Sequence, residues 1–398
     1  MSGSIRVIHV ITEIVMGGAT DNTLLTVEGL DPEVYSVSLV SSRGGEMYER
    51  VTGGGYPVRL LKCLRRAIDP VADLCCVFRL FQIFRSSRCQ IVHTHSSKAG
   101  FLGRLAAVLA GVPIVVHTVH GWPFNDFMNP IVRRIFIAAE KWAAGLCHRL
   151  VMVSELNASE AIDLGIARRS DMKVIYSGID FTKFRKSTGS SQGREILFRD
   201  FGIPGDAPLV GMVGRLFRQK GPDIFVRTAA MVLKSHPHAR FVFIGDGPLL
   251  SETAELIKSM GLEDRVILTG WRRDAHILLP ALDVFLLTSR WEGLGRAITE
   301  AAFMGIPIVG ARVNGVPEVV RDGVTGFLFE AEDEKTAARH VCTLLDDPEL
   351  RRRLGADSRE WIEKTFDCGV MVDSIDSLYR ELLAERGFHL PFTGGVES

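Results

Sequence analysis

Two loops contain charged residues that are spaced so that they could act together on a phosphate ester. The first loop is GRLFRQKG at residues 214–221. It follows an apolar, β-branched run, precedes a helical pattern, and contains Arg215 and Lys220. Two cations beside a helix N-terminus can neutralise a diphosphate, the arginine through a fork of donors and the lysine as a point charge. A departing nucleoside diphosphate requires such a site, although a solvated basic loop would have the same composition.

The second loop, SRWEGLGRAITEA at residues 289–301, places two carboxylates around a glycine turn. Glu292 falls in the turn after a strand, and Glu300 falls in the helix that Gly295 opens. Gly293 and Gly295 leave the backbone N–H groups of the helix start accessible to phosphate oxygens. The two carboxylates can then accept hydrogen bonds from a sugar on one side and a ribose on the other. A capping glutamate and an exposed helix glutamate are the alternative interpretation.

Taken together, these loops resemble the donor domain of family 4 glycosyltransferases, which have the GT-B fold. Arg215 and Lys220 match the Gly-Arg…Lys-Gly diphosphate clamp of that family, and Glu292 with Glu300 matches its Glu-x7-Glu motif. Further matching blocks, in the family's order, are FIGDGP (243–248), LTGW (268–271) and NGVPEVVRDGVTGFL (314–328). The resemblance therefore covers nearly the whole chain.

The resemblance implies a role for individual residues. Glu300 would hold the ribose hydroxyls, Glu292 the donor sugar, and the segment around Trp271 and Arg272 the base. His120 would lie against the transferred sugar. The catalytic residues that we expect are His120, Arg215, Lys220 and Glu292, and the donor-binding residues are Gly17, Gly18, Gly214, Gly245, Trp271, Arg272, Gly293, Leu294, Gly295 and Glu300.

Two of these assignments have a structural alternative. The backbone at Gly17 and Gly18 would approach the donor phosphates once the two domains close, but a plain β-α turn could have the same glycines. His120 follows a strand, where it could also be a hydrogen-bonded structural histidine.

Short apolar strands and helical stretches alternate along the chain, from RVIHVIT (6–12) to IPIVGA (306–311). This alternation predicts parallel sheets, whose ligands lie beyond the carboxyl ends of the strands. The fold class expected is α/β, with two Rossmann-like, doubly wound domains facing a central cleft. We expect an acceptor domain over 1–180, a linker over 181–206, a donor domain over 207–365, and over 366–398 a helix returning towards the first domain plus a tail.

Composition excludes several classes of protein. The chain has 398 residues with 47 basic and 47 acidic side chains, so its zero formal charge is not that of a nucleic-acid binder. Its seven cysteines form no C-x-x-C pair, which favours reduced, structural thiols. The first strand is interrupted by polar residues and no later apolar run is long enough to cross a bilayer, so we expect a cytoplasmic protein without a signal peptide.

A metal site is not expected, and neither is a cofactor. His93, His95 and His117 lie in two strands, and we expect their side chains to be divided between opposite faces of a sheet with no carboxylate to complete a ligand set. The Arg/Lys clamp also removes the need for a divalent ion.

The segments THSSKAGFLGRLA (94–106) and VHGWPF (119–124) resemble a subgroup that builds capsular, exopolysaccharide or O-antigen repeat units on lipid carriers. The expected partners are thus a nucleotide sugar and a glycan or lipid-linked acceptor. Segments 77–88 and 131–142 mix apolar residues with arginines. They could rest on the inner membrane face as peripheral helices, or be core on one side and solvated on the other.

The function expected is therefore that of a retaining hexosyl- or N-acetylhexosaminyltransferase of polysaccharide biosynthesis, with a UDP-linked donor. A sugar-nucleotide epimerase of similar build and a non-catalytic nucleotide-sugar-binding subunit remain alternatives. A dinucleotide oxidoreductase is disfavoured, because no strand ends in G-x-G-x-x-G with an acidic residue about 20 positions later.

Overall fold

The chain folds into two compact units, each built around one parallel sheet. The computed structural model describes residues 4–15, 17–42, 45, 47–124, 128–185 and 191–388. The first unit joins Met1–Gly178 to Cys368–Ser398, and the second is Ile179–Asp367. The expectation of two doubly wound α/β domains is confirmed, and each unit is described below by itself.

The sheet of the first unit has seven strands in the order β3-β2-β1-β4-β5-β6-β7, all paired in parallel. Its strands are apolar and mostly β-branched, as expected for a sheet that is covered on both faces. The strand order reverses between β1 and β4, which makes that edge the topological switch point. The strands are β1 (Ile5–Val10), β2 (Tyr35–Ser41), β3 (Val58–Leu60), β4 (Ile91–His95), β5 (Ile114–Val119), β6 (Arg149–Met152) and β7 (Met172–Val174).

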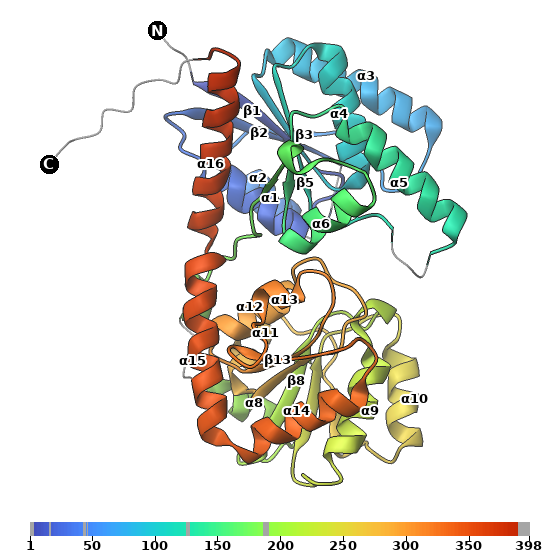
Figure 1. The fold of residues 1–398 in the computed structure, drawn as a ribbon, viewed down its shortest axis with the longest axis vertical. Coiled ribbons are helices and arrows are strands. Elements are labelled where there is room, and N and C mark those ends of the chain that lie inside the picture. Colours follow the sequence, from blue (N-terminus) through green and yellow to red (C-terminus); the bar gives the residue numbers. More distant parts are fainter. Residues whose placement is uncertain are drawn as a thin grey trace, which may run out of the picture. The chain divides into compact units, whose positions relative to one another are not determined.

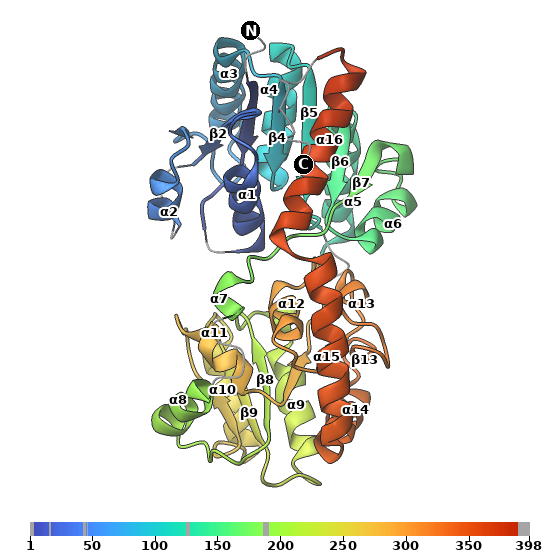
Figure 2. The same cartoon turned by 90° about the vertical axis from the view of Figure 1, so that its left-hand side faces the viewer.

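Helices cover both faces of this sheet. One core joins the strands to α16, which supplies Ile375, Leu378 and Tyr379, and α1 lies on the same face (Figures 1 and 2). A second core lies under α3 and α4, and α5 packs beside α4. The helices of this unit are α1 (Gly18–Gly29), α2 (Tyr48–Gly53), α3 (Pro70–Ser87), α4 (Ser97–Ala110), α5 (Pro130–Ala144), α6 (Glu155–Asp163) and α16 (Cys368–Glu385).

The second unit has six parallel strands in the order β10-β9-β8-β11-β12-β13. They are β8 (Leu209–Val213), β9 (Arg240–Ile244), β10 (Val266–Leu268), β11 (Val284–Leu287), β12 (Ile308–Ala311) and β13 (Gly326–Phe329). The order reverses between β8 and β11, so the loops that follow these two strands lie at the switch point.

The helices of the second unit pack in pairs, α9 against α14 and α12 against α15. Its helices are α7 (Thr182–Arg185), α8 (Gln192–Phe201), α9 (Pro222–Val232), α10 (Leu250–Ser259), α11 (Ala275–Leu278), α12 (Arg296–Phe303), α13 (Val316–Val319), α14 (Glu334–Asp346) and α15 (Pro348–Thr365). Segment 181–206 contains α7 and α8, and Arg194 of α8 forms an ion pair of 2.7 Å with Asp283, just before β11.

Among the described residues, no helix is both long and apolar enough to cross a bilayer. All seven cysteines are free thiols.

Candidate active site

The loops that follow β8 and β11 are bonded to each other along their length. The hydroxyl of Thr288 donates to the carbonyls of Lys220 and Gly221, each at 3.0 Å. The backbone N–H of Arg290 donates to the carbonyl of Gln219 at 2.7 Å. These bonds hold the two sequence-predicted loops together at the switch point of the sheet.

Lys220 and Glu292 meet at this junction as an ion pair between Nζ and Oε1. Their side chains are 16% and 6% exposed, so the pair is largely withdrawn from water. The Ser289 hydroxyl also donates to Glu292 Oε1, at 2.7 Å, and the Glu292 backbone N–H donates to Asn314 Oδ1 at 3.0 Å. Among the described residues, both hydrogen bonds that the structure gives this carboxylate fall on Oε1, so Oε2 can accept from a ligand.

Glycines allow the neighbouring loops to approach this pair closely. Gly245, after β9, has a φ of +149°, and a Cβ there would lie 1.8 Å from the carbonyl oxygen of Gly214. The side chain of Lys220 runs past Gly214, because a Cβ added at Gly214 would meet Lys220 Cε at 3.3 Å. Gly245 also forms an antiparallel bridge with Gly270, which brings in the loop after β10.

Gly293, Leu294 and Gly295 form the turn that leads into α12. Gly295 caps that helix with a left-handed φ of +86°, and a Cβ added there would lie 4.0 Å from Glu292 Cγ. The carbonyl of Gly293 accepts from the backbone N–H of Gly315 at 2.9 Å, and Leu294 is buried. The helix start is thus held beside the Lys220–Glu292 pair.

Arg215 and Glu300, also predicted for this site, have side-chain partners of their own. Arg215 directly follows Gly214 and its guanidinium stacks on the ring of Phe217 at 4.3 Å. Glu300 lies on α12 and accepts from Arg296 Nε at 3.1 Å.

The predicted base-binding segment has one exposed and one engaged side chain. Trp271 is 56% exposed. The guanidinium of Arg272 is bound to Asp200 at 2.8 Å and to Asp274 at 2.6 Å, and the Asp274 carboxylate raises its pKa. Trp271 is thus the more accessible of the two side chains, although the guanidinium of Arg273 lies over its ring at 5.5 Å, while Arg272 contributes to the shape of the loop.

Sequence reasoning missed the residues that orient the predicted ones. Ser289 and Asn314 fix Glu292. Arg290 forms two bonds to Asp223, of 3.0 and 2.8 Å, and one of 2.7 Å to Glu332. Ser289 and Arg290 lie inside the loop that was singled out, so their proximity to Glu292 was the only available signal.

In the first unit, the predicted residues lie at the carboxyl ends of β1 and β5. Gly17 and Gly18 begin α1, and an added Cβ at either would meet no atom within 4 Å, so their backbone is open to a ligand. His120 follows β5, and its Nε2 lies 3.1 Å from Nδ1 of His95. Burial of the ring lowers the pKa of His120 to about 4, so the imidazole is neutral at neutral pH.

The buried histidines of β4 and β5 lie on both faces of the sheet. His93 and His95 are two positions apart in β4 and therefore share a face, where their rings stack at 4.3 Å, and His9 of β1 joins them. His117 lies apart from them, hydrogen-bonded to Thr94 at 2.9 Å. The division between the two faces therefore separates His117 from His93 and His95, and the latter two share a face because the side-chain direction alternates between adjacent positions.

Ring nitrogens of His9, His93 and His95 lie within 4.8 Å of one another, a spacing that a metal ion could bridge. Both nitrogens of His93 already have partners, however, with Tyr379 Oη at 2.6 Å and Thr118 Oγ1 at 2.7 Å. The donor set therefore fits a hydrogen-bond network better than a ligand set.

The arrangement in the second unit can bind a diphosphate and a polyol together. A lysine and an arginine follow β8. Among the described residues no side chain caps the helix start that follows β11, and carboxylates precede and follow that start in the sequence. Preorganised cations and N–H dipoles of this kind stabilise the negative charge on a departing phosphate.

Comparisons with known proteins agree with this geometry. Residues 17–178 match the glycosyl transferase 4-like domain and residues 193–361 match glycosyl transferases group 1. The chain is 31% identical over 385 residues to an Escherichia coli enzyme named UDP-Gal:alpha-D-GlcNAc-diphosphoundecaprenol alpha-1,3-galactosyltransferase, with 96% of this chain and 98% of that protein covered. It is 24% identical to the Staphylococcus aureus capsular polysaccharide biosynthesis glycosyltransferase CapM, over 90% of this chain and 93% of that one.

Among solved structures, Anabaena Alr3699/HepE in complex with UDP and glucose has the same fold. Its TM-score is 0.81 at 21% identity, with 95% of this chain and all of that chain covered. The two family matches, the full-length relative and the two parallel sheets agree with one another. The chain belongs to the group 1 glycosyltransferases, and its fold is GT-B.

Proposed function

We propose that this glycosyltransferase moves a hexosyl or N-acetylhexosaminyl group from a UDP-sugar to a hydroxyl group of a lipid-linked glycan precursor, with retention of anomeric configuration. The name of the E. coli relative supports both halves of the proposal, because it specifies a UDP-sugar donor and an acceptor on diphosphoundecaprenol. Retention is what the resemblance to family 4 implies.

The observation that carries the proposal is the Lys220–Glu292 pair at the β8/β11 switch point. Lys220 and Arg215 would neutralise the diphosphate as it leaves, together with the N–H groups at the start of α12. Glu292 would accept a hydroxyl of the donor sugar through Oε2, since Lys220 and Ser289 occupy Oε1. A phosphate oxygen of the donor would take the acceptor proton, so no separate general base is required.

Glu300 would bind the ribose hydroxyls and Trp271 would lie beside the base. From the first unit, the backbone of Gly17 and Gly18 would approach the donor phosphates, and His120 would contact the transferred sugar. Closure of the two units around the donor would exclude water and limit hydrolysis.

A lipid-linked acceptor requires the enzyme to work at a membrane surface, and the first unit has helices suited to one. Val71, Leu74 and Phe78 form an outward stripe on α3 and are 81%, 74% and 56% exposed. On α5, Ile135 and Trp142 are 62% and 50% exposed. The basic neighbours on these two helices are Arg79, Arg85, Arg134 and Lys141. Apolar stripes flanked by basic residues bind anionic lipid surfaces.

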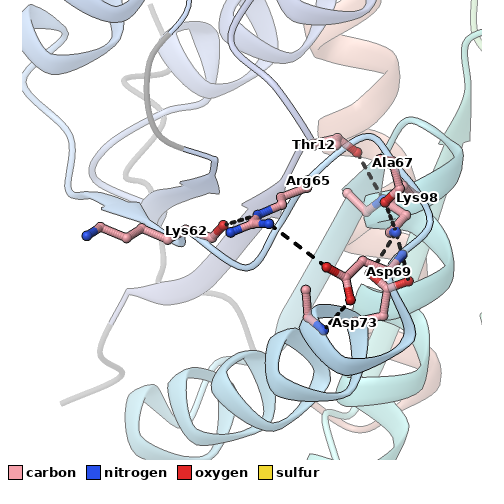
Figure 3. A network of polar contacts seen from close by, with 9 residues as sticks. Thr12, Lys62, Arg65, Ala67, Asp69, Asp73 and Lys98 are labelled. Atoms are coloured by element: carbon pink, nitrogen blue, oxygen red, sulfur yellow. Dashed lines mark hydrogen bonds and ion pairs between the residues drawn. The ribbon is translucent and has the colours of Figure 1, made fainter.

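Ion pairs to α4 hold both helices in place. Lys98 at the start of α4 donates to Asp73 of α3 at 2.8 Å and to the Ala67 carbonyl at 2.6 Å (Figure 3). Arg104 of α4 pairs with Glu140 of α5 at 3.0 Å. The apolar stripes therefore belong to anchored helices, and we propose that the protein is cytoplasmic and binds the inner membrane face peripherally.

A transfer assay tests the catalytic proposal. Purified protein is incubated with radiolabelled UDP-galactose, UDP-glucose or UDP-N-acetylglucosamine, with and without GlcNAc-diphosphoundecaprenol. We expect one donor to label the lipid, with an α-linkage in the product. An epimerised UDP-sugar without acceptor, or donor binding with no transfer to any lipid or soluble acceptor, would contradict the proposal.

A vesicle assay tests the membrane proposal. Co-sedimentation with phosphatidylglycerol vesicles should be lost in the Ile135→Ser, Trp142→Ser double variant. Phe198→Ser is the matched control, because Phe198 is 60% exposed on α8 of the second unit. Equal binding by both variants would remove α5 from the proposal.

A further inference from the structure

An unbroken chain of polar side chains crosses the interior of the first unit. It starts at Thr118 of β5 and passes through the C-terminal helix before ending at His120. The successive links are Thr118 Oγ1 to His93 Nε2 at 2.7 Å, His93 Nδ1 to Tyr379 Oη at 2.6 Å, Tyr379 Oη to His9 Nε2 at 3.5 Å, His9 Nδ1 to His95 Nε2 at 3.0 Å, and His95 Nδ1 to His120 Nε2 at 3.1 Å.

Burial keeps every imidazole in this chain neutral. The pKa of His9 is lowered to about 3, and those of His93 and His95 are lowered well below the usual value. A neutral imidazole has one donor and one acceptor nitrogen, and a buried polar atom without a partner is costly. The nitrogen that carries the proton in one imidazole therefore determines which nitrogen carries it in the next. Only two arrangements, with all hydrogen bonds running in one direction or all in the other, give every polar atom in the series a partner.

The shortest link selects between these orientations. Hydrogen bonds donated by a hydroxyl are shorter than those donated by a ring N–H, and the Tyr379–His93 contact is 2.6 Å. This length favours Tyr379 as the donor to His93 Nδ1, and in that orientation its oxygen accepts from His9 Nε2 while His93 Nε2 donates to Thr118. His9 Nδ1 must then accept from His95 Nε2, and His95 Nδ1 must accept from His120 Nε2.

We propose that this series of hydrogen bonds fixes His120 as the Nε2–H tautomer and that Tyr379 of α16 is a positioning residue for it. His120 then presents Nδ1 as a hydrogen-bond acceptor for a hydroxyl group of the donor sugar. The inference rests on the proposed role of His120 at the transferred sugar, but the tautomer itself can be observed without any substrate.

Tyr379→Phe tests the chain, and Tyr35→Phe is a matched control. Tyr35 lies in the same core, with its ring 5.9 Å from that of Tyr379, but its hydroxyl donates to Asp376 at 2.7 Å and lies outside the chain. Both variants lose one buried hydroxyl, so both should lose some stability. Only Tyr379→Phe removes the group that sets the proton order.

The first measurement is nitrogen-15 NMR of histidine-labelled protein without ligands. We expect His9, His95 and His120 as Nε2–H tautomers in the wild type and in Tyr35→Phe, and mixed tautomers for His120 in Tyr379→Phe. An Nδ1–H tautomer at His120 in the wild type, or an unchanged tautomer in folded Tyr379→Phe, would overturn the proposal.

The second measurement is steady-state transfer. Tyr379→Phe should lower kcat by about tenfold, the effect of one lost neutral hydrogen bond, with the KM for the donor nearly unchanged. Tyr35→Phe should keep the wild-type kcat, and equal losses in the two variants would contradict the positioning role. His120→Ala tests the proposed function separately, because full activity in that variant would remove His120 from the donor site and leave the NMR result standing.

Discussion

Replacing Glu140 by alanine should destabilise the first unit strongly, because it would leave a charge buried without its partner. The Arg104 side chain is 0% exposed and that of Glu140 is 10% exposed. Arg104 NH2 donates to Glu140 Oε2 at 3.0 Å, and its Nε donates to the Gly100 carbonyl at 2.8 Å. After the substitution, the Gly100 carbonyl would still accept from Arg104, but the carboxylate that balances the charge of Arg104 would be missing.

The free energy of unfolding should fall by about 3 to 5 kcal/mol, which is the usual cost of removing one partner of a buried ion pair. For a unit of this size, such a loss corresponds to a fall of about 10 °C in its melting temperature. Differential scanning calorimetry can measure it. Glu155→Ala is the matched control, since Glu155 pairs with Arg169 in the same unit but their side chains are 50% and 57% exposed, and little change is expected there.

A double variant separates the buried charge from the lost packing. Replacing Arg104 by methionine and Glu140 by leucine removes both charges while keeping apolar volume, and it should recover most of the stability. A Glu140→Ala variant that melts as the wild type does would refute the reasoning. So would a double variant as unstable as the single one, because packing alone would then explain the loss.

Three further predictions concern the second unit. Glu300→Ala should weaken UDP binding by roughly tenfold in calorimetric titration. Glu292→Ala should instead lower kcat by about 100-fold or more. Equal donor affinity in both variants and the wild type would count against these roles. Arg215→Ala should reduce kcat/KM more than Arg218→Ala, and the reverse ranking would misplace the diphosphate clamp. Ser289→Ala should lower kcat by about fivefold through the loss of one donor to Glu292, and an unchanged kcat would show that Lys220 alone orients that carboxylate.

The sheets could be predicted because their strands are locally distinctive. Segments such as IRVIHV and RFVFI are short, apolar and rich in β-branched or aromatic residues, and each ends at a polar or glycine-containing turn. Parallel strands buried on both faces require this composition. Ligands lie beyond the carboxyl ends of parallel strands, so the loops after β8 and β11 could be chosen as the place for the site from their charged residues.

The pairing of side chains within the site could not be predicted in the same way. Lys220 and Glu292 are 72 positions apart, and their contact depends on the register between β8 and β11. The partners of Arg272 illustrate the same limit, since Asp200 comes from α8 and is also 72 positions away. The individual roles assigned to the site residues therefore stay predictions until they are measured.

The buried histidines show what a local rule can give and what it cannot. His93 and His95 stack because the period of a strand is two residues. The hydrogen bond between Tyr379 and His93 could not be predicted from the sequence, because Tyr379 lies in a helix 286 positions beyond His93.

The position of α16 has a consequence for how this protein is made. Translation delivers the seven strands of the first unit before the second unit, whereas Ile375, Leu378 and Tyr379, which cover one face of that sheet, follow the second unit in the sequence. Until α16 is synthesised, the apolar residues of the sheet that it covers lack this part of their core. The second unit, whose strands and packing helices are all synthesised before α16, does not depend on this helix. We therefore expect it to complete its fold before the first unit, the reverse of the usual N-terminal-first order of cotranslational folding.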